Sequence, residues 1–410
     1  MENSKKNYKS NKEKMSNILF ITKEIPFPPV NGHRKRTLNF LKELSKWGDI
    51  TLVCFGKENV EKRGIEKYCK DIKLVYKEDV VRKSKLFFSA LIGLFSKIPF
   101  SVRRRFSLNM REEIKKLTKN RNIDLIFCDS IFCVVNLPKN NHNCKIVLGE
   151  HNVESMIIER YRKVEKNIFK KIYAFIEEIK MKIFERKWWR KVDKCIVVSD
   201  IDKKIVEKRI QEKSKIEVIP NGVDTEYFSP SNSISTIPYS LIYVGQMSWY
   251  PNQDAVIYFL EEAYPLIKKR ESRVSFWIIG RGISEKIKRF SQQDNSIKVI
   301  GYVEDIRPYI AQSEIFVVPL RIGSGTRLKI LEAMAMGKPV ISTSIGCEGL
   351  EVENGKNIII CDTSQDFAEA ILKLFKNKSF SKRVEEAGRK LVKEKYSWRK
   401  ILKDLHSKLI

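Results

Sequence analysis

Short runs of β-branched and aromatic residues alternate with amphipathic segments along almost the whole chain. Segments with apolar residues at helical spacing, such as 37–48 and 252–270, separate many of these runs. This alternation predicts parallel βαβ units with right-handed crossovers. The runs occupy 17–25, 49–56, 124–130, 145–152, 194–200 and 215–224 in the first half, and 240–247, 273–282, 296–303, 314–320, 338–343 and 357–362 in the second.

A polar stretch at 229–240, SPSNSISTIPYS, interrupts the alternation, which then starts again. Segments rich in Ser and Pro are typical of linkers. We therefore expect an α/β protein with two doubly wound, Rossmann-like domains, 17–228 and 241–391, followed by a helical segment at 392–410. In open α/β sheets ligands bind at the carboxyl ends of the strands, so the loops at those ends are the candidate site.

The stretch 156–191 has a helical pattern of apolar positions, at 161, 164, 168, 172, 175 and 179. It also carries twelve Lys and Arg against five Asp and Glu. The pattern predicts one long helix with a basic outer face.

Charge narrows the class of partner. The 410 residues include 79 Lys and Arg against 50 Asp and Glu, a formal net charge of +29. Such a surplus favours phosphates, nucleic acid or an anionic membrane face. The eight cysteines are scattered without a Cys-x-x-Cys motif, which suits a reducing cytoplasm and gives no support to a disulfide framework or a zinc site.

Membrane contact is a second question that the sequence raises. No stretch contains the roughly 18–20 apolar residues that span a bilayer, and the polar 1–16 is expected to be a disordered tail. The apolar stretch 86–100 is followed by three arginines, Arg103 to Arg105. Two interpretations stay open for 86–100: a buried core helix, or a surface that docks on anionic lipid.

Glycines stand at the carboxyl ends of several predicted strands, where they permit positive φ angles and close approach of a ligand. The segment GSGTRLKILEAMAMGKPVIST, 323–343, places two of them directly before a helical string. Free N–H groups at a helix start favour an anion. No loop has the Gly-x-Gly-x-x-Gly or Gly-Lys-Ser/Thr pattern, which argues against a nicotinamide oxidoreductase or a P-loop nucleotidase.

Eight motifs follow one another between residues 28 and 343, and the resemblance that they carry covers nearly the whole chain, from about residue 17 to the end. They are PPVNG, GEHN, VVSD, PNGVD, VGQMSWYPNQDAV, IIGRG, VIGYVEDIRPYIAQSEIFVVPL and GSGTRLKILEAMAMGKPVIST. In this order they resemble family four of the retaining glycosyltransferases, which have the two-domain GT-B fold. The resemblance implies a metal-independent enzyme without a cofactor. It further implies a UDP- or GDP-sugar donor on the C-terminal domain and a saccharide or lipid-linked acceptor on the N-terminal domain, in bacterial envelope polysaccharide synthesis. It also implies that the C-terminal helix crosses back to the N-terminal domain.

The resemblance also implies roles for individual residues. Glu332 matches the glutamate that bonds the donor ribose, and the loop 323–327 lies where backbone N–H groups meet the diphosphate. Val303 matches the backbone contact with the nucleobase, and His151 lies beside the transferred sugar. The expected catalytic residue is His151, and the expected donor-binding residues are Gly32, Gly245, Arg281, Val303, Gly323, Ser324, Gly325, Thr326, Arg327 and Glu332.

Two departures from the family pattern affect these roles. Ser324 stands eight residues before Glu332, where the family often has a second glutamate, so a carboxylate cannot act there. The loop GQMSWYPN lacks the Arg and Lys that commonly hold the diphosphate. We assign that charge to Arg327, with Arg281 and Lys329 in reserve.

Alternatives remain from two other classes. A non-catalytic basic protein that binds nucleic acid or anionic membrane would explain the charge, but no nucleic-acid-binding module is recognisable. A nucleotide-sugar epimerase or a phosphorylase would share the two-domain fold. The short Asp200-Ile201-Asp202 pattern reads as a helix cap, so we expect no required metal.

Overall fold

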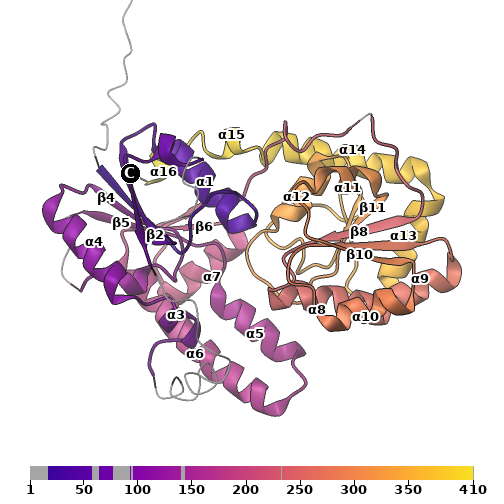
Figure 1. The fold of residues 1–410 in the computed structure, drawn as a ribbon, viewed down its shortest axis with the longest axis horizontal. Helices are drawn as coiled ribbons and strands as arrows, with labels where there is room; N and C mark the ends of the chain where they lie inside the picture. The colour runs from indigo at the N-terminus through magenta and orange to yellow at the C-terminus, as the bar shows by residue number, and fades with distance from the viewer. Residues whose placement is uncertain are drawn as a thin grey trace, which may run out of the picture.

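Two separate parallel β-sheets organise the chain (Figure 1). The computed structural model describes residues 17–57, 64–76, 93, 96–139, 144–231 and 233–409. The prediction of two doubly wound α/β halves is confirmed. In the first half the strand order is β3-β2-β1-β4-β5-β6-β7, and every neighbouring pair is parallel. Its strands are β1 (Asn17–Thr22), β2 (Asp49–Phe55), β3 (Asp71–Val75), β4 (Leu125–Cys128), β5 (Lys145–Gly149), β6 (Lys194–Val197) and β7 (Ile216–Val218).

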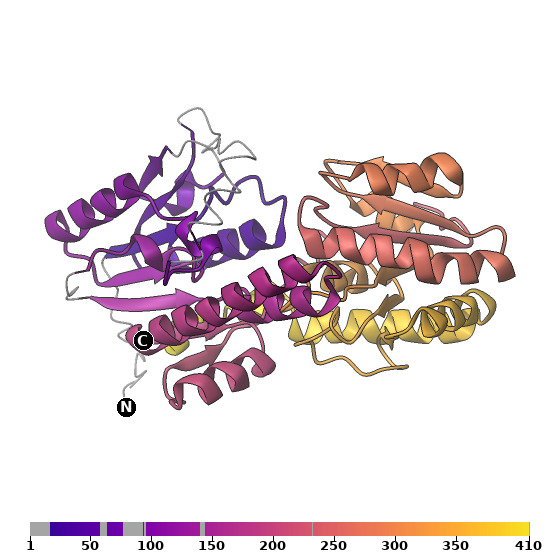
Figure 2. The same ribbon diagram turned by 90° about the horizontal axis from the view of Figure 1, so that it is seen from below.

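Helices connect these strands and cover both faces of the first sheet (Figures 1 and 2). Side chains from the two faces of β1 lie in different core clusters, Leu19 in one and Phe20 in the other. This burial on both faces explains why the strands read as continuous apolar runs. The α-helices are α1 (Gly32–Leu44), α3 (Phe100–Arg103), α4 (Leu108–Asn120), α5 (Glu154–Val164), α6 (Ile168–Lys191) and α7 (Asp200–Ile210).

The second sheet has the order β10-β9-β8-β11-β12-β13 and is also parallel throughout. Its strands are β8 (Ser240–Val244), β9 (Ser275–Ile279), β10 (Ile297–Gly301), β11 (Ile315–Val318), β12 (Val340–Ser342) and β13 (Ile359–Ile360). The helices are α8 (Tyr250–Tyr258), a π-helical turn (Phe259–Ala263), α9 (Tyr264–Arg270), α10 (Glu285–Gln293), α11 (Arg307–Gln312), α12 (Leu328–Ala335), α13 (Ser364–Lys376) and α14 (Lys378–Lys395).

The strand order reverses once in each sheet, between β1 and β4 in the first and between β8 and β11 in the second. At such a reversal the connections leave the carboxyl ends of two neighbouring strands in opposite directions, which opens a crevice for a ligand. The segments that follow β4 and β11 therefore define where a site forms.

The C-terminal residues lie against the first half of the chain. Two short helices, α15 (Trp398–Ile401) and α16 (Leu405–Leu409), stand where the sequence predicted one. Trp398, Leu402 and Leu405 share a buried cluster with Ile18 and Phe20 of β1. The chain therefore passes from the second sheet back to the core beneath the first (Figure 1).

The prediction of one helix over 156–191 is wrong. The stretch forms α5 and α6, which pack against each other, with a break at 165–167. The break is stabilised locally, because the Glu165 carboxylate accepts hydrogen bonds from two backbone N–H groups and the Asn167 side chain caps α6.

The predicted basic outer face of that stretch is also wrong in part. Ile168, Ile172, Phe175 and Ile179 point outward and are exposed. Most of the apolar segment 86–100 lies outside the described residues, so neither interpretation of that segment is tested. None of the helices in the described part of the chain is long and apolar enough to cross a bilayer.

Candidate active site

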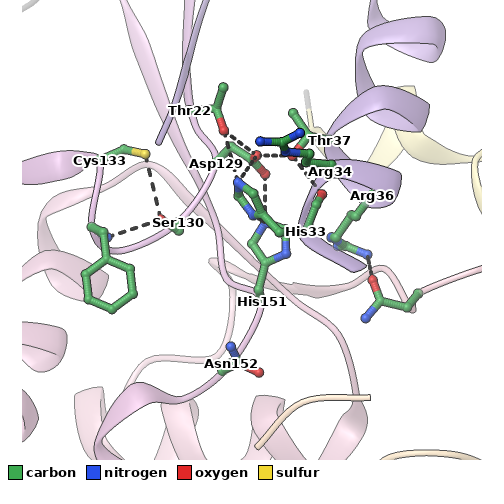
Figure 3. A network of polar contacts seen from close by, with 12 residues as sticks. Thr22, His33, Arg34, Arg36, Thr37, Asp129, Ser130, Cys133, His151 and Asn152 are labelled. Carbon is green, nitrogen blue, oxygen red and sulfur yellow. Dashed lines mark hydrogen bonds and ion pairs between the residues drawn. The ribbon is translucent and has the colours of Figure 1, made fainter. Parts of the chain in front are cut away.

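Three side chains meet where the strand order of the first sheet reverses (Figure 3). Asp129 directly follows β4, His33 lies in the first turn of α1, and His151 follows β5. His151 Nε2 lies 2.8 Å from Asp129 Oδ1 and 3.2 Å from His33 Nδ1. Parallel strands end at one edge of the sheet, so residues far apart in the chain converge there.

One arrangement of protons satisfies all these contacts. His151 Nε2–H donates to Asp129, and the Thr22 hydroxyl donates to the other oxygen of Asp129 over 3.0 Å. His33 Nε2–H then donates to the Thr22 oxygen over 3.2 Å, and the unprotonated His33 Nδ1 is a second acceptor for the same His151 Nε2–H. Asp129 is almost fully buried, so it fixes the orientation of the His151 ring.

Both imidazoles are neutral near pH 7. Burial, reinforced by the positive charge of Lys23, holds the pKa of His33 well below its usual value. Burial also lowers the pKa of His151, although the neighbouring Asp129 carboxylate acts in the opposite direction. A neutral His151 can exchange hydrogen bonds with a hydroxyl without adding charge to the site.

The backbone beside Asp129 is strained. Ser130 has a φ angle of 147°, in a region that only glycine adopts easily. Strain of this kind persists where the surrounding structure imposes it, and it clusters at functional sites. Ser130 therefore supports a functional role for the end of β4.

The same three residues are the candidates for holding a cation. The ligand atoms of His33, Asp129 and His151 lie within 4.8 Å of one another, and two imidazoles with a carboxylate suit a transition metal. These ligand atoms are already hydrogen-bonded to one another, however, so the three side chains have partners without a metal ion.

The loop 323–327, in the second half of the chain, contacts residues of the first half. The Val153 N–H donates to Ser324 Oγ over 3.0 Å, and the Asn221 amide donates to Thr326 Oγ1 over 2.9 Å. Gly325 has a φ angle of 72°, and a Cβ atom on it would overlap the carbonyl oxygen of His151. The loop expected to bind the diphosphate and the histidine expected beside the sugar are therefore in contact.

Arg327 is buried at the base of this loop with part of its guanidinium unpartnered. Its Nη1 donates to the carbonyl oxygens of Ser324 and Gly325, whereas Nε and Nη2 have no hydrogen-bond partner. Burial lowers its pKa to about 10. A buried cation with free N–H groups is costly on its own and complements an anion.

Glu332 lies on α12 and is paired with Lys35 of α1, so this contact joins the two halves. The start of α1 also touches the start of α12, since a Cβ on Gly32 would lie 3.1 Å from Leu328 Cδ1. Lys35 occupies one of the two carboxylate oxygens, so a ligand that engages both oxygens of Glu332 competes with the Lys35 ammonium group.

Lys329 lies on the same turn of α12, facing β8. Its Nζ contacts the Tyr243 hydroxyl at 2.9 Å and Asn252 Oδ1 at 3.1 Å, and a Cβ on Gly245 would lie 2.7 Å from it. Burial lowers its pKa to about 7, helped by the positive charge of Arg327. Lys329 thus puts an amino group that titrates near neutral pH beside the loop after β8, a loop that has no basic residue of its own.

Two expected residues lie apart from this cluster. Arg281 follows β9, is exposed, and stacks on the ring of Tyr302 at 3.6 Å. Val303 follows β10 and is partly buried against the second core. In the described part of the chain, neither side chain forms a hydrogen bond or an ion pair with the loop 323–327.

Sequence reasoning missed Asp129, His33 and Lys35 as individual site residues. Asp129 follows the buried strand LIFC directly, so its position at a carboxyl end was a usable signal. His33 and Lys35 stood in the sequence only as part of a charged loop. Their partners lie 118 and 297 positions away, which no local pattern reveals.

Comparison with known proteins gives the family of each half of the chain. The first half matches the model described as Glycosyltransferase Family 4 over residues 30–227. The second half matches Glycosyl transferases group 1 over residues 238–377. Neither alternative weighed from the sequence, a non-catalytic basic protein or a nucleotide-sugar epimerase, gains support from the comparisons.

Individual relatives and solved structures share low sequence identity with this chain. An uncharacterised 44.6 kDa protein in the cps region of Klebsiella pneumoniae is 25% identical over 95% of this chain and 99% of its own length. The UDP-Gal:α-D-GlcNAc-diphosphoundecaprenol α-1,3-galactosyltransferase of Escherichia coli is 27% identical over 47% of this chain and 51% of that protein. The structure of Anabaena HepE in complex with UDP-glucose has a TM-score of 0.67 at 12% identity, covers 96% of this chain and 99% of HepE, and shows the shared fold. With both halves matched and the two sheets in place, the chain belongs to the family 4, group 1 glycosyltransferases of the GT-B fold.

Proposed function

We propose that this glycosyltransferase moves a sugar from a UDP-sugar to a lipid-linked saccharide, with retention of anomeric configuration and without a metal ion. The observation that carries the proposal is the meeting of the loop 323–327, Glu332 and His151 between the two halves. A glycine-rich loop before a helix, a carboxylate and a neutral imidazole can bind the diphosphate, the ribose and the sugar of such a donor.

The donor is held mainly by the second half. Glu332 accepts hydrogen bonds from the two ribose hydroxyls, since a carboxylate offers two acceptor oxygens to a vicinal diol. The diphosphate lies at the start of α12, where backbone N–H groups, the unpartnered N–H groups of Arg327 and the Lys329 ammonium supply positive charge. Arg281 and Val303 then border the nucleobase.

The transfer is an exchange of oxygens on one face of the sugar. The bond from C1 to the diphosphate oxygen breaks, the acceptor oxygen bonds to C1 from the same side, and its proton passes to the departing phosphate. Positive charge around the diphosphate stabilises the developing negative charge. His151, oriented by Asp129, hydrogen-bonds a sugar hydroxyl and positions the ring.

No side chain is assigned as a nucleophile. Ser324, at the position where relatives often have a glutamate, donates or accepts hydrogen bonds only. Asp129 is engaged by His151 and Thr22. Direct transfer therefore suits the residues present better than a covalent intermediate.

The names of two relatives support the choice of acceptor. The Escherichia coli enzyme acts on a sugar linked to diphosphoundecaprenol. A Staphylococcus aureus relative, 27% identical over 52% of this chain and 60% of its own length, is the capsular polysaccharide biosynthesis glycosyltransferase CapM. We place the present enzyme in the same kind of pathway, at the cytoplasmic face of the membrane.

The test is a transfer reaction with a panel of UDP- and GDP-sugars and a sugar-diphosphoundecaprenol acceptor. We expect one UDP-sugar to be consumed, a product with the donor's anomeric configuration by NMR, and an unchanged rate in EDTA. An inverted product, or a rate abolished by EDTA and restored by a divalent cation, would overturn the mechanism. Isomerisation of the donor without transfer would overturn the activity.

A further inference from the structure

The helix α6 buries its carboxylates and exposes a row of large apolar side chains. All three of its carboxylates, Glu177, Glu178 and Glu185, are buried. Its large apolar side chains at 168, 172, 175, 179 and 183 are exposed instead. An ordinary surface helix has the opposite arrangement.

Buried partners explain the inward carboxylates. Glu185 accepts hydrogen bonds from the backbone and hydroxyl of Ser155 and pairs with Arg209 at 2.9 Å. Glu177 accepts from the Phe100 N–H at 2.6 Å, and Glu178 pairs with Arg162. The inner face of α6 therefore combines these polar contacts with the buried apolar side chains of Met181, Phe184 and Trp189, and a second set of apolar side chains is left exposed on the outer face.

The exposed apolar residues form a continuous line, which we call the α6 ridge. Their spacings of four, three, four and four residues place them on one face of the helix. From Ile168 to Ile183, fifteen steps along the helix, this line is about 22 Å long. The exposed fractions are 60% for Ile168, 52% for Ile172, 49% for Phe175, 43% for Ile179 and 63% for Ile183.

Positive charge surrounds the ridge. The exposed residues of α6 outside it are Phe169 and five basic side chains, Lys170, Arg186, Lys187, Arg190 and Lys191, and none is acidic. Arg186 and Arg190 continue the line of the ridge at the same spacing. The segment that holds the exposed Arg104 and Arg105 contacts α6 through Phe100 and Glu177.

We propose that the α6 ridge docks on the surface of an anionic lipid bilayer. An apolar line bordered by lysine and arginine fits an interface where acyl chains meet anionic headgroups. The absence of exposed carboxylates on α6 favours lipid over a protein partner, because protein surfaces carry both signs of charge.

The position of the ridge is consistent with the proposed function. The choice of a lipid bilayer as the partner rests on that function. The helix α5 packs against α6, and Arg160 of α5 donates to the Gly323 carbonyl and pairs with Glu348. Figure 2 shows the α5–α6 pair crossing from the first half toward the second. The helix α5 therefore links α6, which carries the ridge, to the donor loop, and the proposed membrane surface adjoins the helix that contacts that loop.

The experiment is sedimentation of the full-length protein with vesicles of phosphatidylglycerol or of phosphatidylcholine, at low and high salt. We expect binding to phosphatidylglycerol that weakens at high salt. In the variant Ile172→Ser/Ile179→Ser, the partition coefficient onto phosphatidylglycerol vesicles is expected to fall at least about tenfold. The variant Arg186→Glu/Arg190→Glu is expected to show a similar fall. Ile201→Ser, an exposed isoleucine on α7, is the matched control and should bind as the wild type does.

Two further measurements separate the possible failures. The ridge variants should have the circular dichroism spectrum and the calorimetric donor affinity of the wild type. If the wild type itself does not bind a donor, that result counts against the proposed function and not against the ridge. Salt-independent binding to both lipids, or ridge variants that bind as the wild type does, would overturn the ridge proposal. So would the absence of vesicle binding together with a dimer in solution that the ridge variants dissociate.

Discussion

At the scale of single residues, the site is assembled from partners that lie far apart in the sequence. Glu332 and His151 could be selected from motifs, because each follows a recognisable signature. Asp129, His33 and Lys35 could not be assigned roles, since the fold alone brings their partners near. Arg327 also turned out to bind its own loop, with only part of its guanidinium left for a ligand.

The pairing of Lys35 with Glu332 leads to a first prediction. Glu332→Ala should weaken donor binding by about 1.5–3 kcal/mol, because a charged hydrogen-bond acceptor is lost. Lys35→Ala should bind the donor more tightly than the wild type, since no ammonium group then competes with the ribose hydroxyls for the Glu332 carboxylate. Calorimetry with the nucleotide sugar measures both, and an unchanged affinity in Glu332→Ala would remove this residue from the site.

The Asp129–His151 hydrogen bond leads to a second prediction. His151→Ala and Asp129→Asn should each lower turnover by more than they weaken donor binding, because both act on the position of the sugar during reaction. The double variant should lose little beyond the worse single variant. Additive losses, or equal losses in turnover and affinity, would indicate that His151 only supports the core.

Lys329 leads to a prediction about pH. Burial lowers its pKa to about 7 in the free protein, and a bound diphosphate favours the protonated form. Binding therefore takes up a proton above about pH 7, and affinity should fall by up to about tenfold for each pH unit above that point. Calorimetry in buffers of different ionisation enthalpy detects the proton uptake. Lys329→Arg, which stays charged, should abolish the slope, and a slope that persists would contradict this role.

At the scale of elements, the alternation of apolar runs predicted the strands and helices well. Buried parallel strands have a distinctive composition, and both sheets follow from it. The break between α5 and α6 and the outward apolar line of α6 were not predictable. Periodicity marks a face of a helix but does not say whether the core lies on that side. In α6 the buried face carries both ion-paired carboxylates and the core residues Met181, Phe184 and Trp189.

The loop before α12 gives the prediction at this scale. Gly325→Ala should lower kcat/KM by about a hundredfold, because the added methyl group overlaps the His151 carbonyl oxygen and forces the two halves apart. Gly355→Ala is the matched control, since Gly355 has a similar φ angle of 77° and nothing within 4 Å of its Cβ position. That control should lose about 1 kcal/mol of stability from backbone strain and keep its activity. Equal effects of the two substitutions on activity would contradict the contact between loop and histidine.

At the scale of the whole molecule, the two halves are joined by polar contacts and by the returning C-terminal helices. Three residues of the first half, Lys35, Asn221 and Arg160, make polar contacts with the second half. Their partners lie in the loop 323–327, in the helix α12 or at Glu348. The donor is proposed to occupy or border the same regions. The fold and family could be read from the sequence because many motifs occur in fixed order. These contacts between the halves could not, because they depend on how two separately folded sheets meet.

The central claim is that a nucleotide sugar binds between the halves through Glu332 and the loop before α12. Calorimetric titration of the wild type and Glu332→Ala with UDP, GDP and their sugars tests it most directly. We expect the wild type to bind one class of nucleotide sugar, and we expect Glu332→Ala to remain folded by circular dichroism while losing at least about tenfold in affinity. If neither class of nucleotide sugar binds the wild type, or if the variant binds as tightly as the wild type does, the proposed donor site is contradicted.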